Sequence, residues 1–416
     1  NNFMRALWFT TTPSNYSPVG GYNGGGWISS LEKELSKRND INLGISFFMK
    51  GQPPKSEHNG VTYYPISDIY SGSLFKKVRG ALTCSENKDT ERTKIFLKVI
   101  SDFKPDIIEV FGSEQGFGLV SQFVHIPIAL HIQGILTPYA TAFLPPFISL
   151  YNYIWEDCNP WCAFKRYKGY KSFCRNGARE RRIIALVNNF IGRTEWDKRI
   201  TKLYHPNARY FYGGEILRNI FYEQKERTLP EKATFVTTIS SPLYKGYDVV
   251  LKTAKLLKER DNFNFVWQIY GNINSHYIEH QTGIRHEDVN VILMGVATAK
   301  QLRDALLQAT AYLHLSYIDN SPNSLCEAQI LGLPVIATSV GGVSSLIKEG
   351  ETGFLVPAND PYQTAYLAIK LSSDLSLNVE IGKRAQFIAR QRHNKQSIVN
   401  GLVNIYHKIL NEERDH

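Results

Sequence analysis

The chain has 416 residues, of which 43% are hydrophobic and 21% are charged. These values are ordinary for a globular protein of two or three domains, and they exclude a disordered or collagen-like chain. The 48 Lys and Arg residues outnumber the 38 Asp and Glu residues and give a net charge of +10. Such an excess favours anionic partners, among them nucleotide phosphates, an acidic membrane surface and nucleic acid.

Short apolar runs and helical patterns alternate along the first half of the chain. Strands are predicted at 6–12, 41–48, 106–111, 126–132, 183–191 and 208–212. Their near-continuous apolar character is typical of parallel strands that are buried on both faces. A glycine-rich loop that includes Gly25 and Gly26 follows the first strand and precedes a helical pattern at 27–38.

The pattern restarts after a polar stretch at 223–232, which we interpret as a linker. Strands are predicted at 234–239, 263–270, 289–293, 311–315, 335–338 and 354–356. Helices are predicted at 247–260, 299–308, 324–331, 344–348, 362–372 and 396–413. Two successive strand–helix series predict an α/β protein with two doubly wound, Rossmann-like domains that face each other across a cleft. We place these domains at 1–222 and 223–392, with a C-terminal helix at 393–416.

The cysteines form no recognisable disulfide or zinc pattern. Cys158 and Cys162 have three residues between them and Cys174 is nearby, but no fourth ligand lies close in the sequence. We therefore expect reduced thiols and a cytoplasmic protein. A run of about 18 apolar residues, which a membrane-spanning helix requires, does not occur.

The segment at 316–328 is the most informative stretch for function, because it follows a predicted strand and opens a helix. Ligands of open α/β sheets bind beyond the carboxyl ends of the strands. Asp319 and Glu327 flank seven residues of this segment, and Asn323 or Ser324 can cap the helix. A carboxylate one turn into such a helix can accept ribose hydroxyls, and the free amides there can bind an anion. The alternative is that Asp319 caps a turn and Glu327 only favours the helix dipole.

Three features follow one another in this part of the chain: the run from Asp319 to Glu327, the sequence Gly-Leu-Pro-Val-Ile-Ala-Thr at 332–338, and the pair Gly341 and Gly342. Together they resemble the signature of the retaining glycosyltransferases of sequence family 4. The family signature is an acid, seven residues, a glutamate, a helix that leads into G-x-P-V-I-A-T, and a glycine pair. The match is dense over 311–356 and thins to scattered points before 234. The resemblance implies the GT-B fold, with the donor held by the C-terminal domain, the acceptor by the N-terminal domain, and a last helix that can cross back.

The resemblance implies a role for each residue of this motif. Glu327 binds the nucleotide ribose, and Asp319 contacts the transferred sugar near the reacting centre, although the family usually has the longer glutamate there. The backbone amides of Asn323, Ser324 and Leu325 meet sugar hydroxyls or phosphate.

Lys245 matches the lysine with which the family neutralises the departing diphosphate. Cleavage of the anomeric bond leaves negative charge on the β-phosphate, which a preorganised cation stabilises. The family has an arginine five residues earlier, where this chain has Ser240. Arg193 could replace it, or the amides at Gly25 and Gly26 could hold the phosphates. The alternative for Lys245 is a solvated loop charge.

The family's histidine after an N-domain strand has two candidate positions here. His131 is the candidate catalytic histidine, although it could instead be a core residue, and alignment places the family histidine nearer Gln133. Ser345 stands where the family often has a glutamate.

Base recognition in this fold relies on backbone at strand ends such as Gly271, so the sequence leaves UDP- and GDP-sugars open. Because no D-x-D pair occurs to clamp a metal, we predict catalysis without a metal or other cofactor.

Residues 143–182 combine many aromatic and basic side chains. Between Trp161 and Arg182 the only acid is Glu180. Such a surface can adhere to anionic lipid, which suggests peripheral contact with the inner face of a membrane. The alternatives are a solvated helical hairpin with inward-facing aromatics, or a nucleic-acid patch. No nucleic-acid motif accompanies the charge, so we expect no nucleic-acid partner.

Taken together, these features predict a metal-independent, hexosyltransferase-type enzyme. It would move a sugar from a UDP- or GDP-sugar to a carbohydrate or lipid-linked acceptor with retention of configuration, in cell-surface polysaccharide or glycolipid synthesis. Two alternatives stay open. One is a non-catalytic protein that binds nucleotide sugars or lipid surfaces, because Ser240 and Ser345 depart from the motif, and the other is a sugar-nucleotide epimerase on the same fold.

Overall fold

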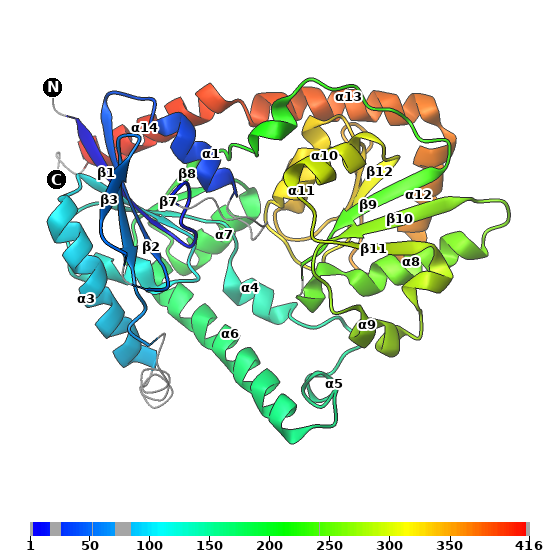
Figure 1. Cartoon of the computed structure of the whole chain (residues 1–416), viewed down its shortest axis with the longest axis horizontal. Helices are drawn as coiled ribbons and strands as arrows, with labels where there is room; N and C mark the ends of the chain where they lie inside the picture. The colour runs from blue at the N-terminus through cyan, green and yellow to red at the C-terminus, as the bar shows by residue number, and fades with distance from the viewer. Residues whose placement is uncertain (1–2, 17–25, 52, 71–84, 241, 413–416) are drawn as a thin grey trace.

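The computed structural model describes residues 3–16, 26–51, 53–70, 85–240 and 242–412, which form two mainly parallel β-sheets flanked by helices (Figure 1). The strand order in the N-terminal sheet is β3-β4-β2-β1-β5-β6-β7-β8. Its strands are β1 Met4–Thr10, β2 Ile41–Phe48, β3 Ser56–His58, β4 Val61–Ile66, β5 Ile107–Phe111, β6 Ile128–His131, β7 Asn189–Gly192 and β8 Arg209–Tyr212. Neighbouring strands are parallel except for β3 and β4, an antiparallel hairpin at one edge. The helices of this half are α1 Gly26–Leu35, α3 Ser85–Phe103, α4 Leu136–Thr141, α5 Leu150–Ile154, α6 Pro160–Leu186 and α7 Glu195–Tyr204.

The C-terminal sheet has the strand order β11-β10-β9-β12-β13-β14, and its described pairs are parallel. Its strands are β9 Ala233–Thr238, β10 Phe265–Tyr270, β11 Val291–Gly295, β12 Ala311–His314, β13 Val335–Thr338 and β14 Phe354–Val356. The helices of the second half are α8 Tyr247–Glu259, α9 Ser275–Thr282, α10 Ala299–Leu307, α11 Asn323–Ile330, α12 Pro361–Ser373, α13 Leu375–Arg392 and α14 Lys395–Glu412. The predicted α/β class with two doubly wound sheets is confirmed.

The predicted strand at 183–191 is wrong in its first half. Ile183 and Ile184 belong to the last turn of α6, and the strand β7 begins only at Asn189. Both isoleucines are buried. From the sequence alone, a short apolar run that ends a buried helix cannot be distinguished from a buried strand. The helix predicted at 344–348 is a single 3₁₀ turn, Val343–Leu346.

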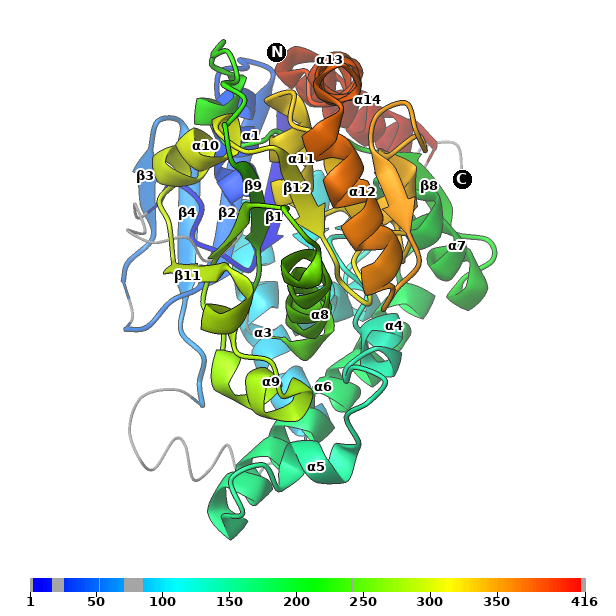
Figure 2. The same cartoon turned by 90° about the vertical axis from the view of Figure 1, so that its right-hand side faces the viewer.

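The last helix packs on the N-terminal sheet, not on the sheet that precedes it in sequence. Helix α13 runs along one side of the C-terminal sheet, and α14 continues across to lie beside α1 (Figures 1 and 2). The buried Tyr406 of α14 accepts a hydrogen bond from Trp8 Nε1 at 2.8 Å and donates to the buried Glu109. The C-terminal helix therefore ties the two halves together on the side away from α6.

Candidate functional site

Loops that follow strands of both sheets meet between the two domains. Asn320, which is fully buried, lies in the loop after β12 and reaches the N-terminal half. Its Nδ2 donates to the backbone oxygen of Gln133 at 3.0 Å and to Asp197 Oδ2 at 2.9 Å. Its Oδ1 accepts from Thr194 Oγ1 at 2.7 Å. These contacts fix the loops after β6 and β7 against the loop after β12.

A cavity of about 180 Å³ lies at this junction. It is lined by Gly26, Trp27, Gln133, Arg193, Glu215, Leu217, Arg218, Ser321, Asn323 and Glu327. Four of these residues, namely Gly26, Arg193, Asn323 and Glu327, are predicted donor-binding residues. The lining is rich in charge and in groups that form hydrogen bonds, and its guanidinium groups can form charge-assisted hydrogen bonds to an anionic ligand.

Glu327 lies on α11, whose first residue, Asn323, also lines the cavity. The Glu327 side chain is 2% exposed, and Arg218 holds both of its oxygens, with Nε to Oε1 at 2.7 Å and Nη2 to Oε2 at 2.6 Å. Burial raises the pKa of Glu327, and the guanidinium of Arg218 acts in the opposite direction. This bidentate pair orients the carboxylate at the cavity wall.

Arg193 and Glu215 form a second buried ion pair in the wall. Arg193 also donates to the backbone oxygens of Gln133 at 3.2 Å and Ser321 at 3.4 Å, so it links the two halves of the chain. Burial raises the pKa of Glu215, and Arg193 opposes that rise.

Several buried polar atoms of the lining find no hydrogen-bond partner in the described part of the chain: Gln133 Nε2, Arg193 Nε and Asn323 Oδ1. Native proteins pair the large majority of buried polar atoms with protein, water or ligand. These atoms therefore have unused hydrogen-bonding capacity, which a ligand or a water could satisfy.

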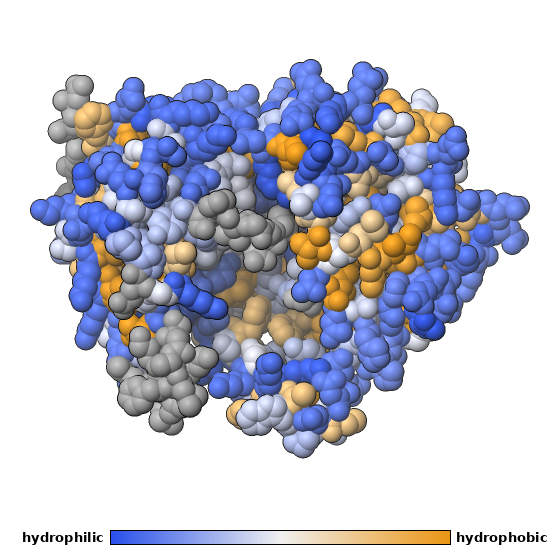
Figure 3. Space-filling model, in the orientation of Figure 1, coloured by the Kyte–Doolittle hydropathy of each residue, from blue (hydrophilic) through white to orange (hydrophobic). Residues whose placement is uncertain are grey.

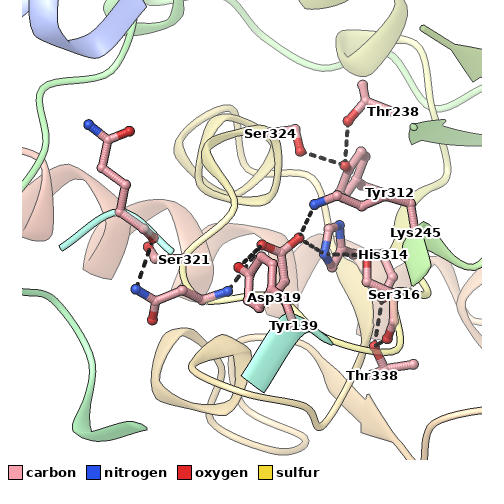
Figure 4. A network of polar contacts seen from close by, with 12 residues as sticks. Tyr139, Thr238, Lys245, Tyr312, His314, Ser316, Asp319, Ser321, Ser324 and Thr338 are labelled. Carbon is pink, nitrogen blue, oxygen red and sulfur yellow. Dashed lines mark hydrogen bonds and ion pairs between the residues drawn. The ribbon is translucent and has the colours of Figure 1, made fainter. Parts of the chain in front are cut away.

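Lys245 meets Asp319 beside this cavity (Figure 4). Lys245 Nζ donates to Asp319 Oδ2 at 2.7 Å, and His314 Nε2 lies 3.0 Å from the same oxygen. The other oxygen accepts from the backbone N–H of Asn320 at 3.0 Å and from the Tyr139 hydroxyl at 3.4 Å. Burial alone would raise the pKa of Asp319, but Lys245 and His314 outweigh it and hold the pKa well below its usual range. Asp319 is therefore a buried carboxylate that is kept ionised.

Two glycines allow the neighbouring loops to approach this carboxylate. Gly246 has φ +79°, and a Cβ there would lie 1.9 Å from the backbone oxygen of Leu315. Gly341 has φ +53°, and a Cβ there would lie 2.0 Å from the backbone oxygen of Asp319. Any other residue at either position would push the Lys245 loop or the glycine-pair loop away from the 315–319 segment.

The histidine predicted to be catalytic lies in the core of the N-terminal half. His131 is the last residue of β6, is 1% exposed, and places Nδ1 2.7 Å from Glu109 Oε1. Its ring packs against Trp27, which lines the cavity, but His131 itself is not part of the lining. Gln133, two residues later, is part of it. The catalytic role of His131 stays a prediction.

Other predicted residues lie outside the cavity wall. Lys245, Asp319 and Gly271 do not line the cavity, and Gly271 packs at the end of β10 against the backbone of Ile239. Ser324 Oγ accepts a hydrogen bond from Tyr312 at 2.8 Å. Leu325 is buried in the core of the C-terminal half, and Gly25 lies outside the described residues.

Sequence reasoning missed Arg218, Glu215 and Tyr139. Arg218 and Glu327 are 109 positions apart, and Tyr139 and Asp319 are 180 positions apart. No local pattern marks such contacts. His314 could have been noticed, because it is the last residue of the strand that leads into the motif.

Within the described ranges, no group of three or more His, Cys, Asp or Glu side chains is placed to hold a metal ion. Cys158, Cys162 and Cys174 are free thiols. Among the described helices, none is long and apolar enough to cross a membrane.

Comparison with known sequences identifies the second half of the chain. The model of the family described as Glycosyl transferases group 1 matches residues 220–387. A segment of 130 residues, 31% of the chain, is 28% identical to N-acetyl-alpha-D-glucosaminyl L-malate synthase of Bacillus anthracis and covers 34% of that protein. A segment of 150 residues, 34% of the chain, is 29% identical to D-inositol 3-phosphate glycosyltransferase of Streptomyces avermitilis and covers 32% of it. The matched segments thus span about a third of each relative.

Solved structures resemble the whole chain. Sucrose-phosphate synthase from Thermosynechococcus elongatus superposes with a TM-score of 0.73 at 13% identity, over 98% of this chain and 100% of that one. Anabaena HepE in complex with UDP-glucose gives a TM-score of 0.64 at 14% identity, over 99% and 100% of the two chains. WaaG, a glycosyltransferase of lipopolysaccharide biosynthesis, gives 0.64 at 13% identity, over 96% and 99%. The chain therefore has the GT-B fold, and its residues 220–387 form a domain of the glycosyl transferases group 1 family.

Proposed function

We propose that the chain transfers a sugar from a nucleotide-diphosphate sugar to a carbohydrate or lipid-linked acceptor, in the synthesis of a cell-surface polysaccharide or glycolipid. The observation that carries this proposal is the interdomain cavity, because it combines the family's glutamate, Glu327, with two guanidinium groups and the first residue of α11. The family match favours a transferase over an epimerase or a non-catalytic binding protein.

In this proposal Glu327 accepts the ribose hydroxyls. Each of its oxygens accepts one hydrogen bond from Arg218 and keeps a further lone pair for a ligand. The structures of HepE contain UDP or UDP-glucose, which supports a UDP-sugar as the donor here.

The diphosphate would lie between the cavity and Lys245. The missing arginine at Ser240 is then replaced by Arg193 and Arg218, which both line the cavity. Lys245 would turn from Asp319 toward the leaving phosphate as negative charge develops on it. These cations support catalysis without a metal, since they can neutralise the diphosphate themselves. Retention of configuration is proposed on the resemblance of the 319–327 motif to the retaining family.

We further propose that the protein works in the cytoplasm. The free thiols of Cys158, Cys162 and Cys174 support a reducing compartment.

Calorimetric titration of the full chain with UDP and GDP tests the donor site. We expect one of them to bind, and Glu327→Gln to weaken it by about tenfold or more, because a hydrogen bond to a charged group contributes roughly 1.5–3 kcal/mol. The matched control is Glu380→Gln, which breaks an exposed pair with Arg384 on α13. Equal affinities of the two variants, or binding of neither nucleotide, would contradict the proposed donor site.

A further inference from the structure

Helices α5 and α6 project from the body of the molecule, away from both sheets (Figures 1 and 2). We call residues 150–186 the α5–α6 hairpin. Helix α6 has 27 residues, which corresponds to about 40 Å. Asn159 caps its outer end through hydrogen bonds from the backbone N–H groups of Trp161 and Cys162, and Pro160 occupies the first turn. The outer end of α6 is thus a capped helix start, while Tyr153 of α5 packs against the core of the C-terminal half.

Large aromatic side chains are exposed at this outer end. The exposed fractions are 77% for Trp161, 70% for Tyr151, 58% for Phe164, 44% for Tyr167 and 40% for Trp155. The rings of Trp161 and Phe164 stack with centroids 6.3 Å apart. In Figure 3 this tip shows pale and light-orange atoms among the blue ones. An aromatic cluster left in water is unfavourable, so it indicates a partner that buries it.

Cationic side chains follow the aromatic ones along the same exposed face of α6. Trp161, Phe164, Lys168, Lys171 and Arg175 follow one another at steps of three and four residues, which places them on one face of the helix. The three basic residues among them are exposed. Lys171 lies about 15 Å from Trp161 along the helix axis. Aromatic rings at the tip and cations one to three turns behind them match the order of acyl boundary and phosphate headgroups in a bilayer.

The acidic residues of the hairpin offset only a small part of this charge, because Glu156 and Asp157 share one cation and leave a net charge of −1 near the tip. Glu156 and Asp157, near the tip, both pair with Arg166, at 2.6 and 2.8 Å. Glu180 is the only acid of α6 and is fully buried. The hairpin therefore presents a positive surface, which is complementary to anionic phospholipid.

The inner end of the hairpin is attached to the candidate site. Glu180 accepts hydrogen bonds from the backbone N–H groups of Leu136 at 2.9 Å and Thr137 at 3.0 Å, at the start of α4. Tyr139 of α4 reaches Asp319. A surface that holds the tip would thereby also fix the orientation of the interdomain cleft.

We propose that the outer end of the α5–α6 hairpin inserts its aromatic side chains into the headgroup region of a bilayer that contains anionic phospholipid, while its lysines contact the lipid phosphates. This inference does not depend on sugar transfer. A lipid surface fits better than nucleic acid, because stacking of bases requires a charged groove and α6 presents a convex face.

Flotation of the full chain with vesicles tests the proposal. We expect binding to vesicles of phosphatidylcholine with 30% phosphatidylglycerol, at least tenfold weaker binding to phosphatidylcholine alone, and a loss of binding in high salt. Trp161→Ser combined with Phe164→Ser should weaken binding at least tenfold. The matched control replaces Tyr362 and Tyr366 of α12, which are equally exposed, with Ser and should change nothing.

Charge reversal and a depth probe complete the experiment. Replacing Lys165, Lys168 and Lys171 by Glu should reduce binding at least a hundredfold, since each basic residue near an anionic surface contributes about fivefold in affinity. Replacing the exposed Lys300, Lys383 and Lys408, which lie outside the hairpin, by Glu should reduce vesicle binding far less. Lipids brominated near the headgroup should quench Trp fluorescence, and Trp161→Phe should remove most of that quenching. Vesicle binding that survives the hairpin substitutions, or tight binding of single-stranded DNA in place of vesicles, overturns the proposal.

Discussion

At the scale of single residues, the two carboxylates of the motif are each held by a cation of the chain itself. Asp319 pairs with Lys245 and Glu327 with Arg218, but the consequences for the pKa differ in sign. Burial prevails for Glu327 and raises its pKa, whereas Lys245 and His314 prevail over burial for Asp319 and lower its pKa. Asp319 therefore stabilises the fold above its unfolded pKa of about 4, and this contribution is lost as the pH falls below it.

Replacement of Lys245 tests the role of the ammonium group. We expect Lys245→Ala to slow sugar transfer by about a hundredfold or more, because a preorganised charge at the leaving group is lost. The matched control is Lys252→Ala, since Lys252 pairs at 2.9 Å with Asp248, another buried aspartate of the same domain. Both variants should lose stability, and only the first should lose transfer in steady-state assays. Equal transfer rates would show that Lys245 serves the fold alone.

Replacement of Arg218 tests whether it keeps Glu327 ionised. Without the guanidinium, burial is unopposed and the pKa of Glu327 rises further. Protonated Glu327 can no longer accept two ribose hydroxyls, so the UDP affinity of Arg218→Gln should fall as the pH is lowered from 8 to 6, more steeply than that of the native chain. Titrations at several pH values measure this, with Arg384→Gln at the exposed Glu380 pair as control. Parallel pH profiles for the native chain and Arg218→Gln would contradict the assignment.

At the scale of elements, the buried parallel strands were predictable and the peripheral elements were not. Strands β2, β13 and β14 have the predicted bounds, because runs buried on both faces are mostly apolar. The β3–β4 hairpin and the helices α3 to α7 lack such a signal. Ile183 shows the limit most clearly, because its apolar run continues from a helix into a strand. The motif at 319–327 is local and was found, whereas its partner Arg218 is brought to it only by the tertiary fold.

The contact between α14 and the N-terminal sheet depends on a buried hydroxyl. Tyr406→Phe would leave Trp8 Nε1 without its acceptor and Glu109 Oε2 without its donor, while Glu109 Oε1 would keep His131. Because an unpaired buried polar group costs about 1–3 kcal/mol, we expect a loss of that size in the free energy of unfolding. Urea denaturation measures it, and Tyr362→Phe at an exposed position should change the free energy by less than about 0.5 kcal/mol. If Tyr406→Phe left the free energy of unfolding unchanged, packing alone would hold α14 against the N-terminal sheet.

At the scale of the whole molecule, we propose two separate uses for the basic side chains, one in the cleft and one on the hairpin. Arg193, Arg218 and Lys245 bring cationic groups to the cleft, where each pairs with a carboxylate of the chain, and Lys165, Lys168 and Lys171, which form no ion pair within the described residues, place positive charge on the projecting α6. A donor diphosphate and a lipid surface are both anionic, so we expect the binding of each to weaken as the ionic strength rises.

The cations of the cleft predict activity without a divalent metal. Transfer measured with purified protein in excess EDTA should proceed at the same rate as in buffer with Mg²⁺, because Lys245 and the guanidinium groups neutralise the diphosphate. A rate that collapses in EDTA and returns on addition of Mg²⁺ or Mn²⁺ would contradict this expectation.

The central claim is that one cleft brings Glu327 and Lys245 to the same donor. The most direct measurement is a structure of the full chain determined with UDP bound. We expect the ribose hydroxyls within hydrogen-bonding distance of Glu327, and the diphosphate between the guanidinium groups of Arg193 and Arg218 and the ammonium group of Lys245. A nucleotide bound elsewhere, or one bound in the cleft with Glu327 untouched, would contradict the account.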